Sequence, residues 1–490
     1  MAHICCFWKH WSEINSLKEV ILMRKIIYGI AIILLVALGC GIYFVDSALP
    51  IGNGYTAKYL CSQVFLSARD DGYVFEHDVK PTNGLFSLIS HSVDYKDKTV
   101  TAMGLGFRKP LTAVYRDGFG CTLAINSTRD ELLKQVQGAL PRKKHDPYLV
   151  WPQGEKVDIE ALPPEVDKAR LNKAVADAFK EPLPKNKRNT QGVVVVYKSR
   201  IIAEKYAEGF SPATPILGWS MTKSITNALC GILVKQKKLD IMKPAPVAAW
   251  KKPGDLRSQI TIDQLLRMSS GLKFVEIYGP MKDVTDMLYG SKSMAEYAWE
   301  KPLGTKPDGE WYYSSGTANI IARIERDMVG GTLVGVYNFA RINLFDKLNM
   351  CSAVIEPDAS GSFVGSSYMF ATPRDWARFG LFTLRDGVWN GERILPEGWM
   401  KYSTTPTPLA PKGEYGALFW LNTGEKGNPK NRMYPSLPTD LYYLSGFNGQ
   451  VVAVIPSRDI VIVRMGVTHD ISSWPQEEFI RQVLDSILKR

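Results

Sequence analysis

One uncharged segment near the N-terminus restricts the fold of this chain more than any other feature. Residues 26–45 contain no charged side chain. A helix of about 20 apolar residues can span a bilayer, and it satisfies its own backbone hydrogen bonds there. Arg24 and Lys25 precede the segment, and Asp46 follows it. This charge pattern predicts a single-pass anchor in the inner (cytoplasmic) membrane, with residues 1–25 cytoplasmic and the remainder periplasmic or extracellular.

The start and the processing of this segment stay open. We favour an uncleaved anchor, because Asp46-Ser47-Ala48 is a poor small-x-small cleavage site. Met23 directly precedes the Arg-Lys pair, so the natural start is either Met1 or Met23.

The cysteines agree with an exported chain, because oxidation is permitted outside the cytoplasm. Cys61 and Cys121 both follow the apolar segment, and we predict a disulfide between them. Cys230 lies on the apolar side of a predicted helix and Cys351 follows a short helix-like stretch, and both are expected to be small core residues. No Cys-x-x-Cys or His-Glu-x-x-His spacing occurs, so no metal site is predicted.

The charge of the chain gives no reason to invoke nucleic acid. The net charge is +11, but Lys and Arg are scattered and form no dense run. No glycine-rich phosphate loop or dinucleotide fingerprint is visible either, and we expect no cofactor.

The exported part is predicted to contain a small region and a larger domain. Short extended segments between turn residues make residues 50–140 a β-rich, membrane-proximal region. Prolines and mixed charges mark residues 141–165 as a linker. Residues 166–490 have hairpin patterns near both ends and helical patterns between them. This order predicts an α+β fold, in which an antiparallel sheet from distant sequence is flanked by helices and a helical subdomain.

The sequence Ser220-x-x-Lys223 is the pattern in this domain that indicates chemistry. A serine and a lysine three residues apart share one face of a helix, and a neutral lysine can take the proton of the serine. Apolar residues follow at helical spacing, so Ser220 is expected to open a buried helix. The alternative is a helix N-cap followed by a surface lysine. Two further Ser-x-x-Lys matches, at Ser270 and Ser486, lie at predicted helix ends and are assigned to structure.

A tyrosine offers a second group for proton transfer. No histidine lies between residues 146 and 468, and no Gly-x-Ser-x-Gly elbow is visible, which disfavours a Ser-His-Asp triad. Tyr313 stands between a loop and a predicted helix, where its phenol can face a cleft and relay protons if nearby cations lower its pKa. The alternative is a core tyrosine beside a capping serine.

Three motifs together resemble a known family. Ser220-x-x-Lys223, then Tyr313-Ser314-Ser315, then Leu444-Ser445-Gly446 stand in the order found in class C β-lactamase-related serine hydrolases. This family includes D,D-peptidases, class C β-lactamases, family VIII esterases and 6-aminohexanoate-dimer hydrolases. The resemblance covers about residues 160–490 and implies a β-lactamase/transpeptidase-like fold.

The resemblance also implies roles for individual residues. Ser220 would be the nucleophile, Lys223 the general base, and Tyr313 the group that assists it and protonates the leaving group. The backbone amides of Ser220 and Phe447 would form the oxyanion hole. The substrate site would be lined by Ser315, Ser445 and Gly446, and we add Tyr312 and Trp420 as candidate aromatic walls.

Two departures from the family pattern bear on the substrate. Leu444 replaces the lysine that holds a substrate carboxylate, and Ser315 replaces the usual asparagine. We therefore expect a small ester or linear amide as the substrate. The alternatives are a D,D-peptidase or β-lactamase, and a catalytically silent wall- or ligand-binding module. Catalysis also requires that Lys223 be neutral near pH 7, through burial and a neighbouring cation.

Overall fold

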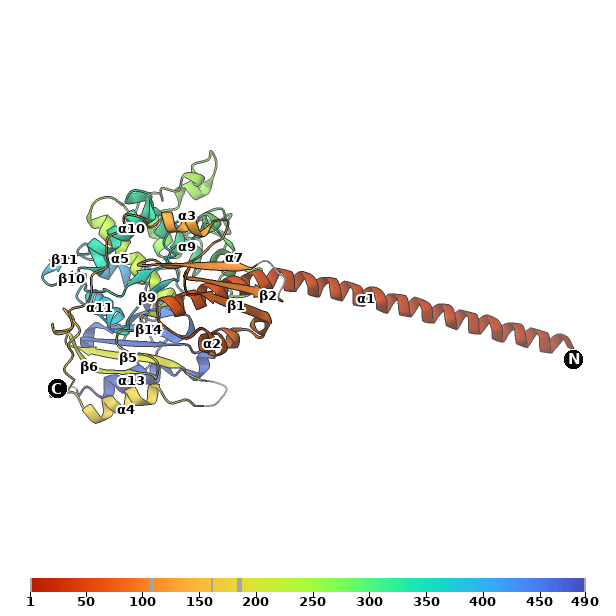
Figure 1. Cartoon of the computed structure of the whole chain (residues 1–490), viewed down its shortest axis with the longest axis horizontal. Helices are drawn as coiled ribbons and strands as arrows, with labels where there is room; N and C mark the ends of the chain where they lie inside the picture. Colours follow the sequence, from red (N-terminus) through yellow and green to blue (C-terminus); the bar gives the residue numbers. More distant parts are fainter. Residues whose placement is uncertain (1, 106–109, 160–161, 183–186, 489–490) are drawn as a thin grey trace.

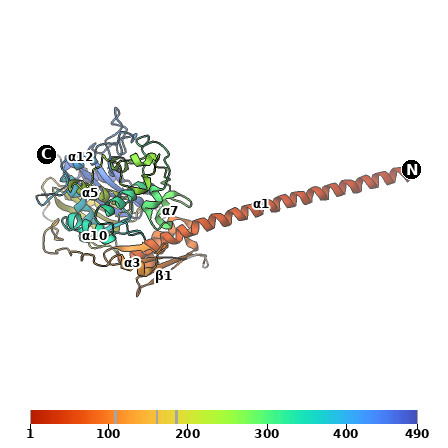
Figure 2. The same cartoon turned by 90° about the horizontal axis from the view of Figure 1, so that it is seen from above.

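The computed structural model describes residues 2–105, 110–159, 162–182 and 187–488. One long helix, α1 (Ala2–Phe65), projects as a straight rod from a rounded body (Figures 1 and 2). The helix contains a stretch that is long and apolar enough to cross a membrane. The predictions for Met1, for residues 106–109 of the β-rich region, for residues 160–161 of the linker and for residues 183–186 and 489–490 of the large domain lie outside the described residues.

The largest sheet has six strands, which are β5 (Thr190–Tyr197), β6 (Arg200–Tyr206), β12 (Trp420–Leu421), β13 (Tyr442–Gly446), β14 (Gln450–Ile455) and β15 (Ile460–Gly466). They are antiparallel and lie in the order β12-β13-β14-β15-β5-β6. Because β15 pairs directly with β5, the two ends of the domain meet at the centre of the sheet. The predicted antiparallel sheet from distant sequence is confirmed.

Helices cover both faces of this sheet (Figure 1). α4 (Lys168–Ala178) and α13 (Gln476–Asp485) pack together on one face, and α11 (Pro373–Leu384) packs on the other. Alternate valines of β5 therefore belong to two different cores, with Val193 in one and Val194 in the other. This double burial explains why the strand is apolar at successive positions instead of every second one.

A helical region lies between β6 and β12 in sequence. Its helix α5 (Thr222–Lys235) is buried over most of its length and packs on α9 (Ser315–Met328). The other helices of this region are α6 (Ile262–Leu266), α7 (Asp283–Gly290), α8 (Met294–Trp299), α10 (Leu333–Ala340) and α12 (Trp399–Ser403). Its short strands are β7 (Ile216–Leu217), β8 (Val354–Ile355), β9 (Met369–Ala371), β10 (Val388–Trp389) and β11 (Glu392–Arg393). The region corresponds to the predicted helical subdomain.

The helix α1 does not end where the uncharged segment ends. It continues through Pro50 to Phe65, and the prediction that β structure begins at residue 50 is wrong for this stretch. Pro50 and the nearby glycines are turn-forming types, but here the glycines permit close packing. A Cβ atom on Gly54 would lie 2.8 Å from the Cβ of Tyr289 in α7.

The strands that follow form a four-stranded antiparallel sheet, made of β1 (Ile89–Asp94), β2 (Thr99–Gly104), β3 (Leu111–Arg116) and β4 (Gly120–Leu123). Two short helices, α2 (Asp71–Val74) and α3 (Arg129–Lys134), flank it in sequence. The sheet packs on α1, and its buried residues Val100 and Cys121 share one hydrophobic core with Trp219 of the large domain. The β-rich region is therefore part of the main body instead of a separate module.

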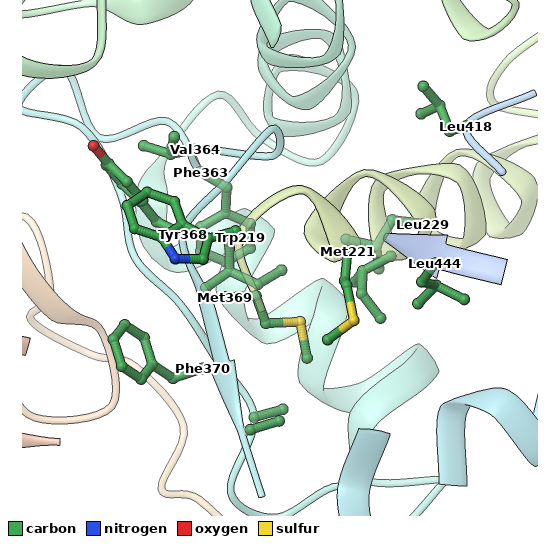
Figure 3. Close-up of a cluster of buried hydrophobic side chains, with 14 of the residues drawn as sticks. Trp219, Met221, Leu229, Phe363, Val364, Tyr368, Met369, Phe370, Leu418 and Leu444 are labelled. Carbon is green, nitrogen blue, oxygen red and sulfur yellow. The ribbon is translucent and has the colours of Figure 1, made fainter. Parts of the chain in front are cut away.

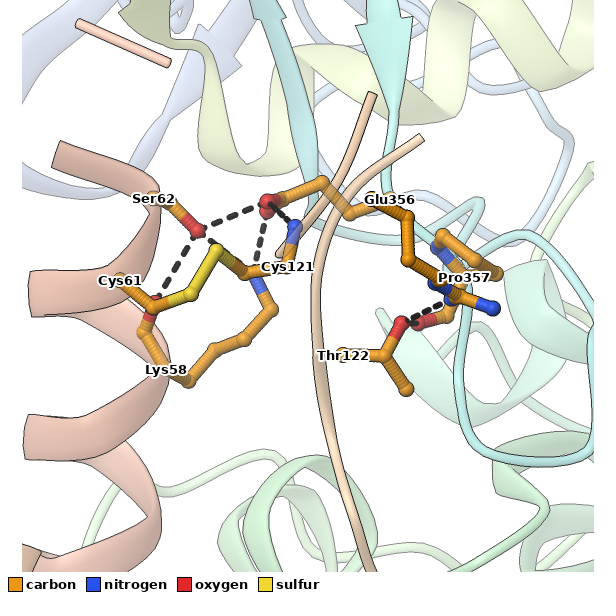
Figure 4. The surroundings of a disulfide bond; sticks show 8 residues. Lys58, Cys61, Ser62, Cys121, Thr122, Glu356 and Pro357 are labelled. Atoms are coloured by element: carbon orange, nitrogen blue, oxygen red, sulfur yellow. Dashed lines mark hydrogen bonds and ion pairs between the residues drawn. A yellow bond between two sulfur atoms is a disulfide. The ribbon is translucent and has the colours of Figure 1, made fainter. Parts of the chain in front are cut away.

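Buried polar contacts join α1 to this sheet and to the large domain (Figure 4). Cys61 of α1 forms a disulfide with Cys121 of β4, the pair predicted from the sequence. Lys58 forms a buried ion pair with Glu356. The Glu356 carboxylate also accepts hydrogen bonds from Ser62 Oγ at 2.7 Å and from the Cys121 N–H at 2.6 Å.

The predicted linker over residues 141–165 is packed against the body. Trp151 is only 3% exposed. The guanidinium of Arg378 in α11 donates to the carbonyl oxygens of Pro152 at 2.9 Å and Gly154 at 2.6 Å. A proline-rich composition indicates an irregular backbone. The carbonyl groups of such a backbone can still accept hydrogen bonds from the body, and these bonds hold the segment in place.

Removing the disulfide should destabilise the protein. The two cysteines are 60 residues apart, and the chain-entropy estimate for a closed loop of that length is about 4 kcal/mol. We expect the double variant Cys61→Ala/Cys121→Ala to have a lower thermal midpoint, followed by tryptophan fluorescence in detergent. Cys351→Ala is the control, because Cys351 is a free thiol. An unchanged midpoint in the double variant would contradict this expectation.

Candidate active site

Ser220 lies on a tight turn between a strand and a buried helix. β7 ends at Leu217, Gly218 follows, and a 3₁₀ turn over Trp219–Met221 leads into α5. A Cβ atom on Gly218 would lie 2.3 Å from the ring of Trp376. The backbone of Trp219 has a φ of 48°, in the left-handed region that a bulky residue adopts only under strain. Such strain recurs at functional sites.

Apolar side chains hold this turn in place. Figure 3 shows Trp219 and Met221 near the start of α5, among other buried side chains that include Tyr368, Phe370 and Leu444. Packing of this kind fixes the backbone on either side of Ser220 and therefore restricts where its hydroxyl can lie.

The side chain of Lys223 is buried beside Ser220. Its Nζ lies 3.1 Å from Ser220 Oγ, 3.1 Å from Ser315 Oγ and 3.0 Å from the carbonyl oxygen of Ser366. Burial lowers the pKa of Lys223 to about 8, against the opposing effect of the Glu276 carboxylate. A cation was predicted beside Lys223, but the charged neighbour is the anionic Glu276. The lowered pKa of Lys223 is therefore caused by desolvation alone.

Tyr313 completes a cluster of three groups. Its ring centroid lies 4.7 Å from Lys223 Nζ, and its hydroxyl lies beside the side chain of Ser220. Burial, together with the charge of Glu276, raises the pKa of Tyr313 above its usual value. The expectation that cations lower this pKa is therefore wrong. The phenol keeps its proton at neutral pH and can donate it.

Glu276 is a site residue that the sequence analysis missed. The N–H of Ser315 donates to its Oε2 at 2.7 Å, and Ser315 Oγ donates to its Oε1. Burial raises the pKa of Glu276. Ser315 itself is fully buried between Glu276 and Lys223, so its side chain positions these groups instead of lining the substrate site as predicted. No motif marks Glu276, because it is a single carboxylate in an irregular loop.

The third motif lies beside the Ser220 turn. A Cβ atom on Gly446 would lie 2.1 Å from the carbonyl oxygen of Gly218, so only glycine allows β13 to come this close. The ring of Phe447 packs edge-on against Trp219, with centroids 5.6 Å apart. Ser445 is half-buried beside Gly446. The backbones of the two predicted oxyanion residues are thus neighbours.

The two candidate aromatic walls have different surroundings. Trp420 lies beside the tyrosine of the cluster, with its ring centroid 5.3 Å from that of Tyr313. Tyr312 is 41% exposed, and its hydroxyl accepts a hydrogen bond from the N–H of Glu276 at 3.2 Å. Trp420 therefore borders the reacting groups, whereas Tyr312 contacts the loop that carries Glu276.

One cluster away from this site has residue types that bind metals. His145, Glu155 and Asp375 have ligand atoms within 4.8 Å of one another. The two carboxylates are already paired with cations, because Arg378 contacts both of them and Arg374 contacts Glu155. The arrangement fits an ion-pair network better than a site for a further positive charge.

The fold and the clustered Ser, Lys and Tyr define the class of β-lactamase-like serine hydrolases. The sequence profile of the Beta-lactamase family matches residues 175–468 of this chain. The match spans more than half of the chain, and the chain belongs to this family.

Several known proteins are similar to this chain. A 6-aminohexanoate-dimer hydrolase of Paenarthrobacter ureafaciens is 25% identical over 313 residues, which are 59% of this chain and 74% of that protein. A Bacillus anthracis structure assigned as a 6-aminohexanoate-dimer hydrolase has a TM-score of 0.52 at 18% identity, covering 74% of this chain and 96% of its own. A structure from Bacteroides dorei, assigned as a β-lactamase, has a TM-score of 0.51 at 15% identity, covering 65% and 99%. These structures confirm the β-lactamase/transpeptidase-like fold.

Proposed function

We propose that this protein hydrolyses an ester or a linear amide through an acyl-enzyme on Ser220. The observation that carries the proposal is the hydrogen bond of a buried lysine amine to Ser220 Oγ at 3.1 Å, with the ring of Tyr313 beside that amine. A lysine whose pKa is about 8 is partly neutral at physiological pH and can accept the serine proton.

The first half of the reaction forms the acyl-enzyme. Ser220 Oγ attacks the carbonyl carbon as its proton passes to Lys223. The negative charge on the carbonyl oxygen is stabilised by the backbone amides of Ser220 and Phe447. Tyr313 then gives its proton to the leaving oxygen or nitrogen and recovers one from Lys223. The proton-transfer steps need a protonated phenol, and the raised pKa of Tyr313 provides it.

The second half releases the acyl group. Water attacks the acyl carbon as one of its protons passes to Lys223. Tyr313 then gives its proton to the departing Ser220 Oγ and recovers one from Lys223. No metal or organic cofactor is needed for any of these steps.

The third motif favours esters and linear amides over substrates that carry a carboxylate. Leu444 is 1% exposed and lies in the apolar core beneath the Ser220 turn. Loss of a charge-assisted hydrogen bond to a substrate carboxylate typically costs about 1.5–3 kcal/mol.

A substrate panel tests the proposal. We expect the full-length protein to turn over p-nitrophenyl butyrate or its anilide and to hydrolyse nitrocefin slowly. Rapid nitrocefin hydrolysis without ester or anilide turnover would instead favour the β-lactamase or D,D-peptidase alternative. Folded protein whose Ser220 reacts with neither a fluorophosphonate nor a penicillin probe would indicate a silent binding module.

The pH dependence of the activity tests the role of Lys223 as a base. Because the base must be neutral, kcat/KM for the ester should rise about tenfold per pH unit below the lysine pKa of about 8 and level off above it. Glu276 opposes the lowering of this pKa. The variant Glu276→Gln should therefore have a lower lysine pKa, and its activity should rise at a lower pH. A profile that does not move, or that moves to higher pH, would contradict this role of Glu276.

We also propose that α1 anchors the protein in a membrane. Its apolar residues from Val20 to Phe44 are exposed along the projecting part of the helix. Burial of the helix begins at Ala48, where the body starts. Membrane fractionation before and after carbonate washing tests the anchor, and protease protection of the intact cell tests on which side the domain lies.

A further inference from the structure

An apolar cavity of about 290 Å³ lies between α1 and the large domain. Its walls come from α1, from the segment before β1 and from the loop and helix around Tyr278 and Tyr289. None of the described residues that line it carries a charge. The volume is close to the lower end of the range for small-molecule sites, about 300–1,000 Å³. The cavity is therefore large enough for a hydrocarbon chain and chemically suited to one.

Aromatic contacts give the cavity a defined shape. The ring of Tyr55 on α1 stacks on Phe86 with centroids 5.2 Å apart and meets Tyr289 edge-on at 5.6 Å. Gly52 on the same helix leaves room beside Phe86, because a Cβ atom there would lie 3.1 Å from its ring. Rigid walls of this kind are typical of preformed ligand sites.

One end of the cavity reaches the catalytic turn. Trp219 and Phe447 both line it. Trp219 directly precedes the nucleophile, and Phe447 is the second proposed oxyanion residue. The ring of Phe447 also stacks on Tyr278 at a centroid distance of 5.3 Å. The cavity therefore ends at the residue that directly precedes the proposed nucleophile.

The other end of the cavity reaches the apolar part of α1. Val45, Ala48 and Leu49 line it, and Val45 is the last residue of the uncharged segment. Apolar side chains on the rim are exposed to the outside, among them Leu88 at 42% and Tyr278 at 39%. Ile277 and Met281, on either side of the lining residues Tyr278–Pro280, are also exposed. The opening is therefore at the depth where the anchored helix would leave the bilayer.

We propose that this cavity binds the acyl chain of a membrane lipid ester or amide, whose carbonyl group then lies at Ser220. The proposal deepens the function proposed above and rests on it. The chain moves from the bilayer into the cavity along the exposed apolar rim without crossing water, which lowers the cost of transfer.

The reaction balances with water as the only co-reactant. The bond from Ser220 Oγ to the acyl carbon forms, and the bond from that carbon to the oxygen or nitrogen of the head portion breaks. The serine proton goes to the departing oxygen or nitrogen. Water then supplies hydroxide to the acyl carbon and a proton to Ser220. The products are a free fatty acid and an alcohol or an amine.

Chain-length preference tests the proposal with the full-length protein in phosphatidylcholine vesicles. We expect a higher kcat/KM for p-nitrophenyl dodecanoate than for the butyrate. The variant Ala48→Trp fills the cavity, and it should lower the dodecanoate-to-butyrate ratio at least tenfold. Ala37→Trp is the matched control, because Ala37 is on the same helix but exposed, and it should leave the ratio unchanged. Leu85→Trp, at a half-buried lining residue, is a second cavity variant in case Ala48→Trp does not fold.

Binding of a dansyl-labelled fatty acid provides a measurement that does not need turnover. In the Ser220→Ala background, Ala48→Trp should weaken this binding at least tenfold and Ala37→Trp should not. One outcome would overturn the acyl-chain site but leave the hydrolase proposal intact. In that outcome the protein turns over the butyrate, the dodecanoate-to-butyrate ratio is the same in all variants, and probe binding is unaltered. Probe binding that depends on the cavity, without turnover of any ester or amide, would overturn the hydrolase proposal instead.

Discussion

Replacing Ser220 by alanine should lower kcat/KM for an ester substrate by at least about ten-thousandfold while the protein stays folded. In the proposed mechanism this hydroxyl forms the covalent bond to the substrate, and the turn around it is held by Gly218 and the apolar cluster of Figure 3. Lys223→Met should cost nearly as much, because the Lys223 amine is the proposed acceptor of the serine proton. Initial rates with p-nitrophenyl butyrate measure both effects.

The double variant and a matched pair elsewhere in the chain make this test specific. Residues that act as one unit are not additive, so Ser220→Ala/Lys223→Met should be no less active than Ser220→Ala alone. The chain offers a control with the same spacing in Ser270 and Lys273, where Lys273 is exposed. Ser270→Ala/Lys273→Met should keep the activity within about twofold. If it lost activity as Ser220→Ala does, the assignment of Ser220 as the nucleophile would fail.

The second large effect is expected on stability. The variant Glu356→Leu should lower the free energy of unfolding by about 3–5 kcal/mol, the usual cost of removing one partner from a buried ion pair. Lys58 would lose its anion in the core, where burial already lowers its pKa. The Cys121 N–H would lose its acceptor, and the Ser62 hydroxyl would keep only the carbonyl oxygen of Lys58. Urea unfolding followed by tryptophan fluorescence measures the change.

An exposed pair and a double variant separate the contributions. Lys347 and Glu392 form an ion pair at the surface, so Glu392→Leu should change the stability by less than about 1 kcal/mol. Adding Lys58→Met to Glu356→Leu should recover part of the loss, because no unpaired buried charge then remains. Equal effects of Glu356→Leu and Glu392→Leu would show that the Lys58–Glu356 pair does not join α1 to the domain.

Local periodicity was enough to predict most of the large domain. The apolar runs of β5 and β15 and the stripe on α5 each indicated their own element, and motif order brought Ser220, Lys223 and Tyr313 together. What failed depended on contacts between distant residues. Pro50 and the glycines after it are turn formers by type, and only the packing of α1 on Tyr289 shows why they stand inside a helix.

The environment of the site was harder to predict than its members. The prediction that Lys223 is buried is confirmed, but a cation was expected beside Lys223 and Tyr313. The charged neighbour of both residues is the carboxylate of Glu276. Glu276 is an anion from a loop that lies 53 residues after Lys223 and 37 residues before Tyr313 in the sequence, and no spacing rule connects it to either motif. Ser315 was placed in the substrate site by resemblance, whereas its full burial makes it a support for Lys223.

The unbroken course of α1 from its exposed apolar part into the core has a mechanical consequence. A helix turns by about 100° and rises by about 1.5 Å per residue. With the proposed anchor in a bilayer, the length of this rod would therefore set both the height and the orientation of the candidate active site above the membrane. Because α1 is one continuous helix from the proposed anchor into the body, an enzyme anchored in this way would work at a constant distance from the membrane surface. Its effective substrate supply is then the number of molecules per unit area of that plane, and dilution of the surrounding solution leaves it unchanged.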